Sequence, residues 1–533
     1  MSLLPSMKHA PFFLALAAAV ACGRSSHGDP GLEAPPDAGA DGTVPDVAGI
    51  RGPLTSVLMH HAHLSRDGAY VEPLITKATA ARAHLDSSFH ATIDGVVYAQ
   101  TLFVKNGPGG RPAIIAVTEK NTVVALDLLS GAQLFSVTLG APVAEAVVKH
   151  WSTNNSSSDP LGITSTPVID EAARRIYVAA MVTPDPSGFT MQQKLFAVSL
   201  DDGSPLARFP VDMSQSLPGF DSAVQNQRGA LALVGGVVYV PYSGFNGDGG
   251  NYRGWLVGVD AATGAIKGHY VTASPRGGSW GPSGVASDGT RLYLSTGNTS
   301  GTTTWGGGEA VLSFAPGPVF SGKTTDYFAP SNWQSLDTTD LDVGGSGVLL
   351  FDVASATPSK LAAAFGKNGV AYLLDRGDLG GIGTGDGAIG EGGWSGQVAD
   401  GIANVPATYR TAMGTYVVVN SFSGGVGCPA GQSGSLVALL VSGGPLRAKV
   451  AWCAEAGGRG GVIATTTDGT SEPIVWVVGA QGDNALHAFD GDTGAAIAVT
   501  EGVGNINRWI APIVVDGRVI VAGDNAVYAF TAR

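Results

Sequence analysis

Seven residues with the chemistry to bind a ligand lie beside short apolar strands that recur along this 533-residue chain. Indole rings stack on planar groups, and guanidinium, ammonium and amide groups neutralise or hydrogen-bond an anion. We therefore predict a site for an anionic planar ligand. The candidate ligand-binding residues are Thr164, Arg228, Trp280, Asn298, Lys367, Arg508 and Trp509.

A structural role for the same residues is the alternative. Trp280 and Trp509 would then fill gaps between neighbouring units of the fold, and Arg228 would pair with a carboxylate at a strand end. The sequence has no G-x-S-x-G nucleophile elbow between a strand and a helix, and no G-x-x-x-x-G-K-[ST] phosphate loop. We accordingly predict no catalytic residues.

Two stretches contain residue types that can bind metals, but we predict a metal site at neither. His60, His61 and His63 stand close together, but scattered histidines in an exposed preamble explain them more simply. Residues 244–254 (GFNGDGGNYRG) are rich in Gly, Asn and Asp but lack the D-x-D-x-D-G series and closing Glu of a calcium loop. No metal ligand is predicted.

Composition favours many short strands joined by tight turns. Glycine accounts for 78 residues, charged residues make up only 14% of the chain, and apolar residues make up 44%. The formal net charge of -13, without a Lys/Arg-rich block, opposes binding to phosphate backbones. We therefore predict no nucleic-acid partner.

One strand and turn pattern is repeated and points to the fold. Residues 256–270 (LVGVDAATGAIKGHY) form an apolar strand that ends in Asp260 and turns at Gly264, and residues 123–135 and 486–498 repeat the pattern. The Asp side chain can hydrogen-bond the backbone just ahead of it, while the Gly takes a left-handed conformation. Four such strands per unit, repeated every 40 to 60 residues, are typical of a β-propeller blade.

We predict an all-β chain with a single propeller of eight four-stranded blades over residues 88–533, preceded by a preamble over 51–87. The last unit ends after three strands, so residues 87–94 (SSFHATID) are expected to close the ring by pairing the N- and C-terminal strands. Seven blades are the alternative, because residues 340–455 are irregular. The eight first strands are expected to begin near Val97, Thr164, Gly229, Ser283, Gly347, Val405, Val462 and Ile510.

The amino terminus predicts export. Lys8, the apolar run PFFLALAAAVA and the small residues before Cys22 form a signal peptide over residues 1–21, too short to span a bilayer. The stretch resembles the lipobox of bacterial lipoproteins, with Ala19 in place of the usual Leu. This implies a lipidated Cys22, and Gly23 after it favours the outer membrane. Residues 22–50 have the composition of a flexible tether.

Cys428 and Cys453 are the two remaining cysteines. In an exported protein a leftover pair predicts a disulfide more readily than a metal site, because no further ligands stand nearby. Two free buried thiols are the alternative.

The repeated units resemble the pyrroloquinoline-quinone (PQQ) repeat of quinoprotein alcohol dehydrogenase-like propellers. The likeness is carried by ITSTPVID with RIYVAA, by LVGVDAATGAI and by LHAFDGDTGAAI, and it extends over residues 90–530. It implies a propeller fold and leaves two functions open, since relatives of this repeat type include PQQ- and calcium-dependent dehydrogenases and scaffolds of outer-membrane protein assembly.

The chain departs from the enzymes of that family. Their repeat ends in a tryptophan that locks adjacent blades, whereas the matching positions here hold Phe135, Ala207, Gly268 and Ala498. Adjacent cysteines and a C-x-x-C-H haem motif are also missing. These departures argue against a firm cofactor assignment, although PQQ and Ca²⁺ remain the cofactors that the resemblance implies.

The leading hypothesis is a lipid-anchored protein of the bacterial cell envelope, on the periplasmic or surface side of the outer membrane, that binds a protein or small-molecule partner as a monomer without catalysis. The alternative is a PQQ- and calcium-dependent dehydrogenase acting on alcohols or sugars, whose channel would hold the quinone or a sugar acid. A third possibility is a carbohydrate-binding surface module, with aromatic residues grouped on one face.

Overall fold

The computed structural model describes residues 51–148, 160–383, 393–401 and 404–533. The predicted signal peptide, the lipidated Cys22 and the tether over residues 22–50 lie outside these ranges. Within them, none of the helices combines the length and apolar character that a membrane span requires.

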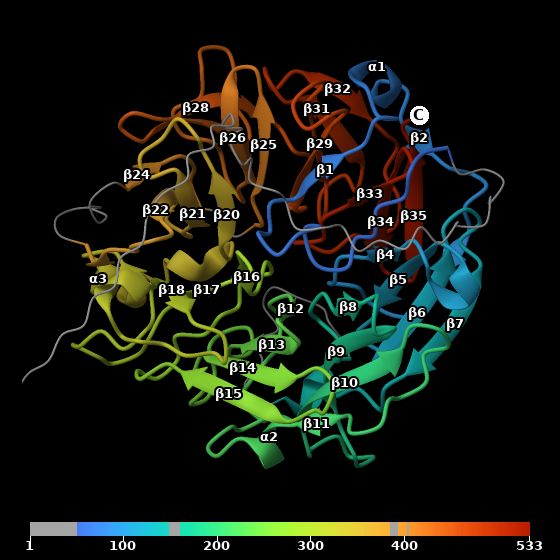
Figure 1. Ribbon diagram of the computed structural model, residues 1–533, viewed down its shortest axis with the longest axis vertical. Coiled ribbons are helices and arrows are strands. Elements are labelled where there is room, and N and C mark those ends of the chain that lie inside the picture. The colour runs from blue at the N-terminus through green and yellow to red at the C-terminus, as the bar shows by residue number, and fades with distance from the viewer. Residues whose placement is uncertain (1–50, 149–159, 384–392, 402–403) are drawn as a thin grey trace, which may run out of the picture. The chain divides into compact units, whose positions relative to one another are not determined.

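Eight sheets follow one another in chain order around a ring (Figure 1). Blades 1 and 2 contain β4 (Leu102–Val104), β5 (Ala113–Val117), β6 (Thr122–Asp127), β7 (Gln133–Thr138), β8 (Val168–Asp170), β9 (Arg175–Val182), β10 (Gln192–Ser199) and β11 (Val211–Asp212). Blades 3 and 4 contain β12 (Ala232–Val234), β13 (Val237–Tyr242), β14 (Trp255–Asp260), β15 (Ile266–Val271), β16 (Ala286–Ser287), β17 (Leu292–Thr296), β18 (Ala310–Phe314), β19 (Tyr327–Ala329) and β23 (Gly381–Ile382).

Blades 5 and 6 contain β20 (Leu349–Asp352), β21 (Lys360–Phe365), β22 (Val370–Asp375), β24 (Trp394–Gln397), β25 (Ala407–Thr411), β26 (Gly414–Asn420), β27 (Leu436–Ser442) and β28 (Arg447–Ala454). Blades 7 and 8 contain β29 (Val462–Thr466), β30 (Ile474–Val478), β31 (Leu486–Asp490), β32 (Ala496–Val499), β33 (Ile513–Val515), β34 (Arg518–Gly523) and β35 (Ala526–Thr531), joined by β1 (Ala69–Val71), β2 (His84–Leu85) and β3 (Ala91–Thr92). The helices are short: α1 (Lys77–Ala80), α2 (Met213–Ser216), α3 (Trp333–Thr339), η1 (Pro108–Gly110), η2 (Glu145–Val147), η3 (Thr324–Asp326) and η4 (Val343–Gly345).

The prediction of an eight-bladed propeller closed by its two terminal regions is confirmed. In blade 8, β2 and β3 both pair antiparallel with β35, so the N-terminal region supplies the outer strand of the last blade. The expected closing stretch, residues 87–94, contains β3. Each first strand begins within five residues of its predicted start.

The turn after β14 shows why the repeated Asp and Gly positions matter. The carboxylate of Asp260 accepts the backbone N–H groups of Ala262 (3.1 Å) and Thr263 (2.9 Å). Gly264 has φ +72°, and a Cβ there would lie 2.7 Å from the carbonyl oxygen of Arg208. A side chain at this position would therefore strain the backbone and collide with the neighbouring blade. Asp127 and Asp490 accept equivalent hydrogen bonds in blades 1 and 7.

The hydrophobic core lies between adjacent blades rather than within any one of them. One cluster joins the facing side chains of β5, β6 and β9, and another joins those of β9, β10, β13 and β14. Burial of this apolar area at about 25 cal/mol per Å² supplies the main stabilisation of each blade contact. A single blade cannot bury its own face, which is why the units hold together only as a ring.

Residues 57–71, here named the channel segment, run along the first strands inside the ring. Val57 exchanges two backbone hydrogen bonds with Phe103 of blade 1, and β1 pairs parallel with β29 of blade 7. Between these ends the carbonyl groups of the segment accept N–H groups from four further blades, in the pairs Leu58 with Ile169, Leu64 with Ser287, Ser65 with Leu350 and Asp67 with Thr408. The segment therefore ties most of the ring together from within.

Arg66 anchors the channel segment to blade 3, which the main-chain hydrogen bonds named above do not reach, and adds a second bond to blade 4. Its side chain is fully buried, and Nε, Nη1 and Nη2 donate to the carbonyl groups of Val285, His60 and Leu231 at 2.8–2.9 Å. These bonds link blades 3 and 4 to the segment, and burial lowers the pKa of Arg66 to about 9. The guanidinium thus remains charged at neutral pH, satisfied by three carbonyl dipoles.

The expectation of an exposed preamble is wrong for His60 and His61, which are 2% and 0% exposed. The backbone pairing of the channel segment seats both side chains inside the ring. Burial lowers the pKa of both, that of His61 to about 4, so both rings are neutral at physiological pH. His63 is the exception and stays largely exposed, with Nδ1 2.8 Å from Asp67. No cluster of three potential metal-ligating side chains occurs in the described residues.

Candidate ligand-binding site at the channel mouth

The predicted site residues lie at one end of the blades. In an antiparallel blade, the start of the first strand and the end of the second lie at the same end. Thr164, Arg228 and Trp280 precede β8, β12 and β16, and Asn298 and Lys367 follow β17 and β21. Arg508 and Trp509 precede β33. We call this end the mouth, and the opposite end basal.

Trp509 stands at the centre of a cationic group at the mouth. The guanidinium carbon of Arg228 lies 4.6 Å from the Trp509 ring centroid, and that of Arg508 lies 4.4 Å from it. A third guanidinium, that of Arg459, stacks 4.8 Å from the ring of Phe422. We name these five residues the tryptophan–arginine cluster.

Arg228 comes from a blade that is not adjacent to those of the other members of this cluster. Arg228 belongs to blade 3, Arg459 to blade 7 and Trp509 to blade 8. In a ring of eight, side chains from blades 3 and 8 can meet only near the central axis. Trp509 therefore lies near the channel axis, where it contacts Arg228 of blade 3 as well as Tyr98 of the adjacent blade 1.

The guanidinium groups of the cluster repel one another. Burial and the neighbouring Arg508 lower the pKa of Arg228 to about 10, and burial together with Arg459 lowers the pKa of Arg508. Among the described residues, no ion pair is found for Arg228 or Arg459, and Nε of Arg228 is buried without a hydrogen-bond partner. In this part of the chain, Arg228 therefore forms no ion pair with a carboxylate at a strand end. A bound anion would relieve this repulsion.

Glu119 is one of the acidic groups that act on Arg228. Its carboxylate accepts the backbone N–H of Gly162 at 2.6 Å, and burial raises its pKa to about 7. At neutral pH it is therefore only partly ionised and cannot fully balance the arginines.

The backbone at Trp509 is strained. Its φ of +74° is rare for a residue with a bulky side chain and costs on the order of 1–3 kcal/mol. Asn507 holds this turn, with Nδ2 donating to the Val97 carbonyl (3.0 Å) and to Asp524 (2.7 Å). The fold thus maintains an unfavourable conformation that places the indole over the channel.

Little space remains beneath Trp509. The cavity that Thr164 lines with His60, Tyr98, Arg228 and Trp509 has a volume of about 10 Å³. This is enough for about one water molecule, whereas small-molecule pockets have volumes of roughly 300–1,000 Å³. His60 of the channel segment forms part of the lining of this cavity.

The other three predicted residues form a second group, which we name the tryptophan–lysine cluster, at the junction of blades 4 and 5. Nζ of Lys367 lies 5.0 Å from the Trp280 ring centroid and 2.8 Å from Asp342. The carboxylate of Asp342 also accepts Nε1–H of Trp280 (2.8 Å) and the backbone N–H of Asn298 (2.9 Å). Trp280 therefore contacts residues at the junction of adjacent blades.

Glu309 completes the tryptophan–lysine cluster from the β17–β18 loop. It is fully buried and accepts the backbone N–H of Val343 at 2.7 Å. Burial, and next the charge of Asp342, raise the pKa of Glu309 well above its usual range. Its carboxyl group is therefore protonated and neutral at neutral pH, so Glu309 adds no second buried negative charge to the cluster.

The described residues do not fit PQQ with Ca²⁺. A Glu, an Asn and an Asp do meet in the tryptophan–lysine cluster, but both oxygens of Asp342 already accept protein N–H donors and Lys367 supplies the counter-charge. A calcium site needs six to eight oxygen ligands, and the small cavity under Trp509 cannot admit a tricyclic quinone.

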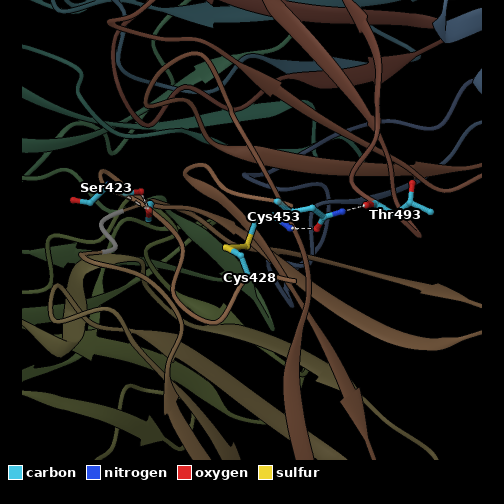
Figure 2. The surroundings of a disulfide bond; sticks show 6 residues. Ser423, Cys428, Cys453 and Thr493 are labelled. Carbon is cyan, nitrogen blue, oxygen red and sulfur yellow. Dashed lines mark hydrogen bonds between the residues drawn. A yellow bond between two sulfur atoms is a disulfide. The ribbon is translucent and has the colours of Figure 1, made fainter. Parts of the chain in front are cut away.

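The predicted disulfide is present. Cys428, in the β26–β27 loop, is bonded to Cys453 in β28, the outer strand of blade 6, 25 residues further on (Figure 2). Gln432 supports it by accepting the N–H of Cys453 (2.9 Å) and donating to the Thr493 carbonyl (3.0 Å). The bond therefore fastens a mouth loop to the rim of the ring and lies away from the channel axis.

Sequence reasoning missed several members of the two clusters. Arg459 stands three residues before β29, just as Arg228 and Arg508 precede β12 and β33, so the same repeat alignment could have found it. Asp342 and Glu309 carry no such signal, because they sit in the irregular region around blades 4 and 5.

Comparison with known proteins agrees with this architecture. Residues 100–313 match the family model described as outer membrane protein assembly factor BamB. Among solved structures, quinohemoprotein alcohol dehydrogenase from Comamonas testosteroni superposes with a TM-score of 0.61 at 15% identity, over 90% of this chain and 80% of that one. A europium-containing methanol dehydrogenase gives a TM-score of 0.59 at 14% identity, over 89% and 90%. The search of curated proteins found no match.

The fold and its repeats define a closed eight-bladed β-propeller. More particularly, residues 100–313 are similar to the family model named above, and the chain shares its propeller fold with the two superposed dehydrogenases. At these identities the superposed enzymes establish the fold alone.

Proposed function

We propose that this protein is a non-catalytic binding protein of the bacterial cell envelope, which recognises an anionic partner through the tryptophan–arginine cluster. The observation that carries the proposal is the closed channel. The channel segment occupies the ring from within, and Trp509 and Arg228 leave a cavity of about 10 Å³ at the mouth. A propeller closed in this way at its mouth can present a surface there but offers no enclosed space at that end for a cofactor and its substrate.

The charge of the tryptophan–arginine cluster supports an anionic partner. The whole chain carries a formal charge of -13, yet three guanidinium groups gather beside Trp509 and Phe422. An acidic segment of a protein would pair with the guanidinium groups and cover the exposed Arg459. Arg459 lies at the rim of the cluster and would meet such a partner first.

The family match supports a scaffolding role in the envelope. The matched model is named for an outer membrane protein assembly factor, and the predicted signal peptide and lipidated Cys22 would place this chain at the same membrane. A dehydrogenase would require the opposite arrangement, an open channel with unpaired oxygen ligands.

A turnover assay tests the absence of catalysis. The purified protein is supplied with PQQ, Ca²⁺ and an artificial electron acceptor, and a panel of alcohols and sugars is screened for dye reduction. We expect no rate above that of the buffer. Sustained, saturable turnover with any substrate would contradict the proposed non-catalytic function.

A binding assay tests the anionic partner. Hexaglutamate, as an acidic peptide probe, is titrated into the protein at low salt, with hexalysine as the opposite-charge control. We expect saturable binding of hexaglutamate that weakens as salt is added, and none of hexalysine. Equal binding of both peptides would contradict an arginine-based site.

A further inference from the structure

A cavity lies at the basal end, far from the tryptophan–arginine cluster along the strands. It has a volume of about 440 Å³ and opens among the channel segment and blades 5, 6 and 7. The residues that line it include the end of β20 and the start of β26, which face away from the mouth. We name it the basal pocket.

The walls of the basal pocket are mostly apolar. Tyr70 and Tyr409 are 8% and 4% exposed, and Leu350 and Ala464 continue the apolar surface. Tyr409 is held in place because its hydroxyl donates to the Gly491 carbonyl at 2.6 Å. Rigid aromatic walls of this kind enclose a small apolar group at low entropic cost, and the volume is within the range typical of small-molecule sites.

The carboxylates of the pocket already have cationic partners. Asp67 accepts a hydrogen bond from Nδ1 of His63 at 2.8 Å, from the Ser65 hydroxyl at 2.7 Å and from the backbone N–H of Ala69 at 3.0 Å. Asp352 is ion-paired with Arg376. A cationic ligand would have to displace one of these pairs to gain a partner.

The positive charge of the pocket is not fully matched. Arg410 forms no ion pair among the described residues, and its Nη2 donates only to the backbone carbonyl of Asp352, at 3.1 Å. The Arg376 side chain is only 10% exposed, and its Nε is buried without a hydrogen-bond partner. Two guanidinium groups therefore offer hydrogen-bond donors beside an apolar chamber.

We propose that the basal pocket binds a small amphipathic monoanion, a carboxylate carried on an aromatic or short aliphatic body. The carboxylate pairs with Arg410 and Nε of Arg376, and the body packs between Tyr70 and Tyr409. Charge-assisted hydrogen bonds of this type fix the orientation of the ligand, while the apolar walls supply the larger part of the affinity.

This inference does not depend on the proposed function, because the two sites share no residue and lie at opposite ends of the ring. Either site can fail its test without affecting the other.

Three probes of equal size and different charge test the proposal: phenylacetate, phenethylamine and 2-phenylethanol. Each is titrated into the purified protein, with binding followed by saturation-transfer NMR and calorimetry. We expect phenylacetate to bind at least tenfold more tightly than phenethylamine, and acetate to bind far more weakly because it lacks the apolar body. Equal affinity for the amine and the carboxylate, or no saturable binding of phenylacetate, would overturn the proposal.

Arg410→Gln locates the binding site. Arg410 is exposed, so the variant is expected to fold, which circular dichroism and the thermal midpoint check. The affinity for phenylacetate should fall at least tenfold, whereas Arg111→Gln, an exposed arginine of blade 1, should leave it unchanged. Unaltered affinity in Arg410→Gln, or an equal loss in Arg111→Gln, would place the ligand elsewhere and overturn the proposal.

Discussion

Two tryptophans at the mouth of this propeller look alike in sequence and differ in what surrounds them. Trp280 and Trp509 each stand just before a first strand, and each has a cation stacked within about 5 Å of its ring. Trp280 joins adjacent blades, and its cation, Lys367, is neutralised by Asp342. Trp509 meets Arg228 across the channel axis, where no carboxylate forms an ion pair with that arginine in the described structure.

We propose that this difference separates a structural network from a binding surface. In the tryptophan–lysine cluster, every strong donor named above reaches the carboxylate of Asp342, and Glu309 is kept neutral. In the tryptophan–arginine cluster, like charges and a strained backbone are held together at a cost in stability. Such costs are typical of positions retained for function rather than for folding.

The largest predicted effect is on stability. Asp342→Ala leaves the side chains of Lys367 and Trp280 and the backbone N–H of Asn298 without their shared acceptor, so we expect a loss of ~3–5 kcal/mol in unfolding free energy. Urea denaturation measures it. Asp340→Ala removes an exposed partner of the same lysine and should cost less than about 1 kcal/mol. Similar losses in the two variants would mean that the cluster is not the structural network described.

The second prediction concerns pH. Because the pKa of Glu309 is raised on folding, the folded state holds a proton that the unfolded state loses above its ordinary carboxyl pKa near 4.5. Stability should therefore fall as pH rises from about 5 toward 9, by at most about 1.4 kcal/mol per pH unit from this group. Asp342, Asp337 and Lys367 are the charged groups that act on it.

Glu309→Gln provides the comparison for the pH dependence, since Gln keeps the shape of the protonated carboxyl. The thermal midpoint of this variant should decline less between pH 6 and pH 9 than that of the unchanged protein. An identical decline would show that Glu309 is ionised in the folded state.

The third prediction uses binding to separate the clusters. Arg228→Gln should weaken the binding of hexaglutamate at least tenfold, about 1.4 kcal/mol, because it removes a cation from the channel axis. Lys367→Gln, at the matching place in the other cluster, should leave that affinity within twofold. Titration of both variants with hexaglutamate measures these affinities. A greater loss of affinity in Lys367→Gln would mean that the tryptophan–lysine cluster, and not the tryptophan–arginine cluster, binds the anion.

The smallest effect should be on the free energy of unfolding of the protein when the tryptophan–arginine cluster is altered. Arg228→Leu relieves repulsion from Arg508, so the unfolding free energy should stay within about 1 kcal/mol of the original value or rise slightly. Denaturation under the conditions used for Asp342→Ala measures it. A loss as large as that of Asp342→Ala would mean that Arg228 is a structural residue.

The repeats made much of the fold predictable from sequence. Residues such as Asp260 and Gly264 specify the turn. The repeated apolar strands predict the number of blades, and the incomplete last unit predicts the closing strand. The disulfide followed from the number of cysteines and the expectation of export. Local chemistry is sufficient in each of these cases.

The channel segment could not be predicted in this way. Its contacts are mostly backbone hydrogen bonds to strands distant in the chain, such as Gly68 with Ala464, and leave no periodic pattern in the sequence. The division of six of the seven candidate residues into two clusters was equally hidden, because Arg228 and Trp509 become neighbours only when the ring closes.

Calorimetric titration of the purified protein with PQQ in the presence of Ca²⁺ tests the central claim most directly. The closed mouth and the satisfied carboxylate of Asp342 predict no saturable heat of binding. A clear one-to-one isotherm that depends on calcium would contradict the account, because it would require the ring to hold a site that the filled channel excludes.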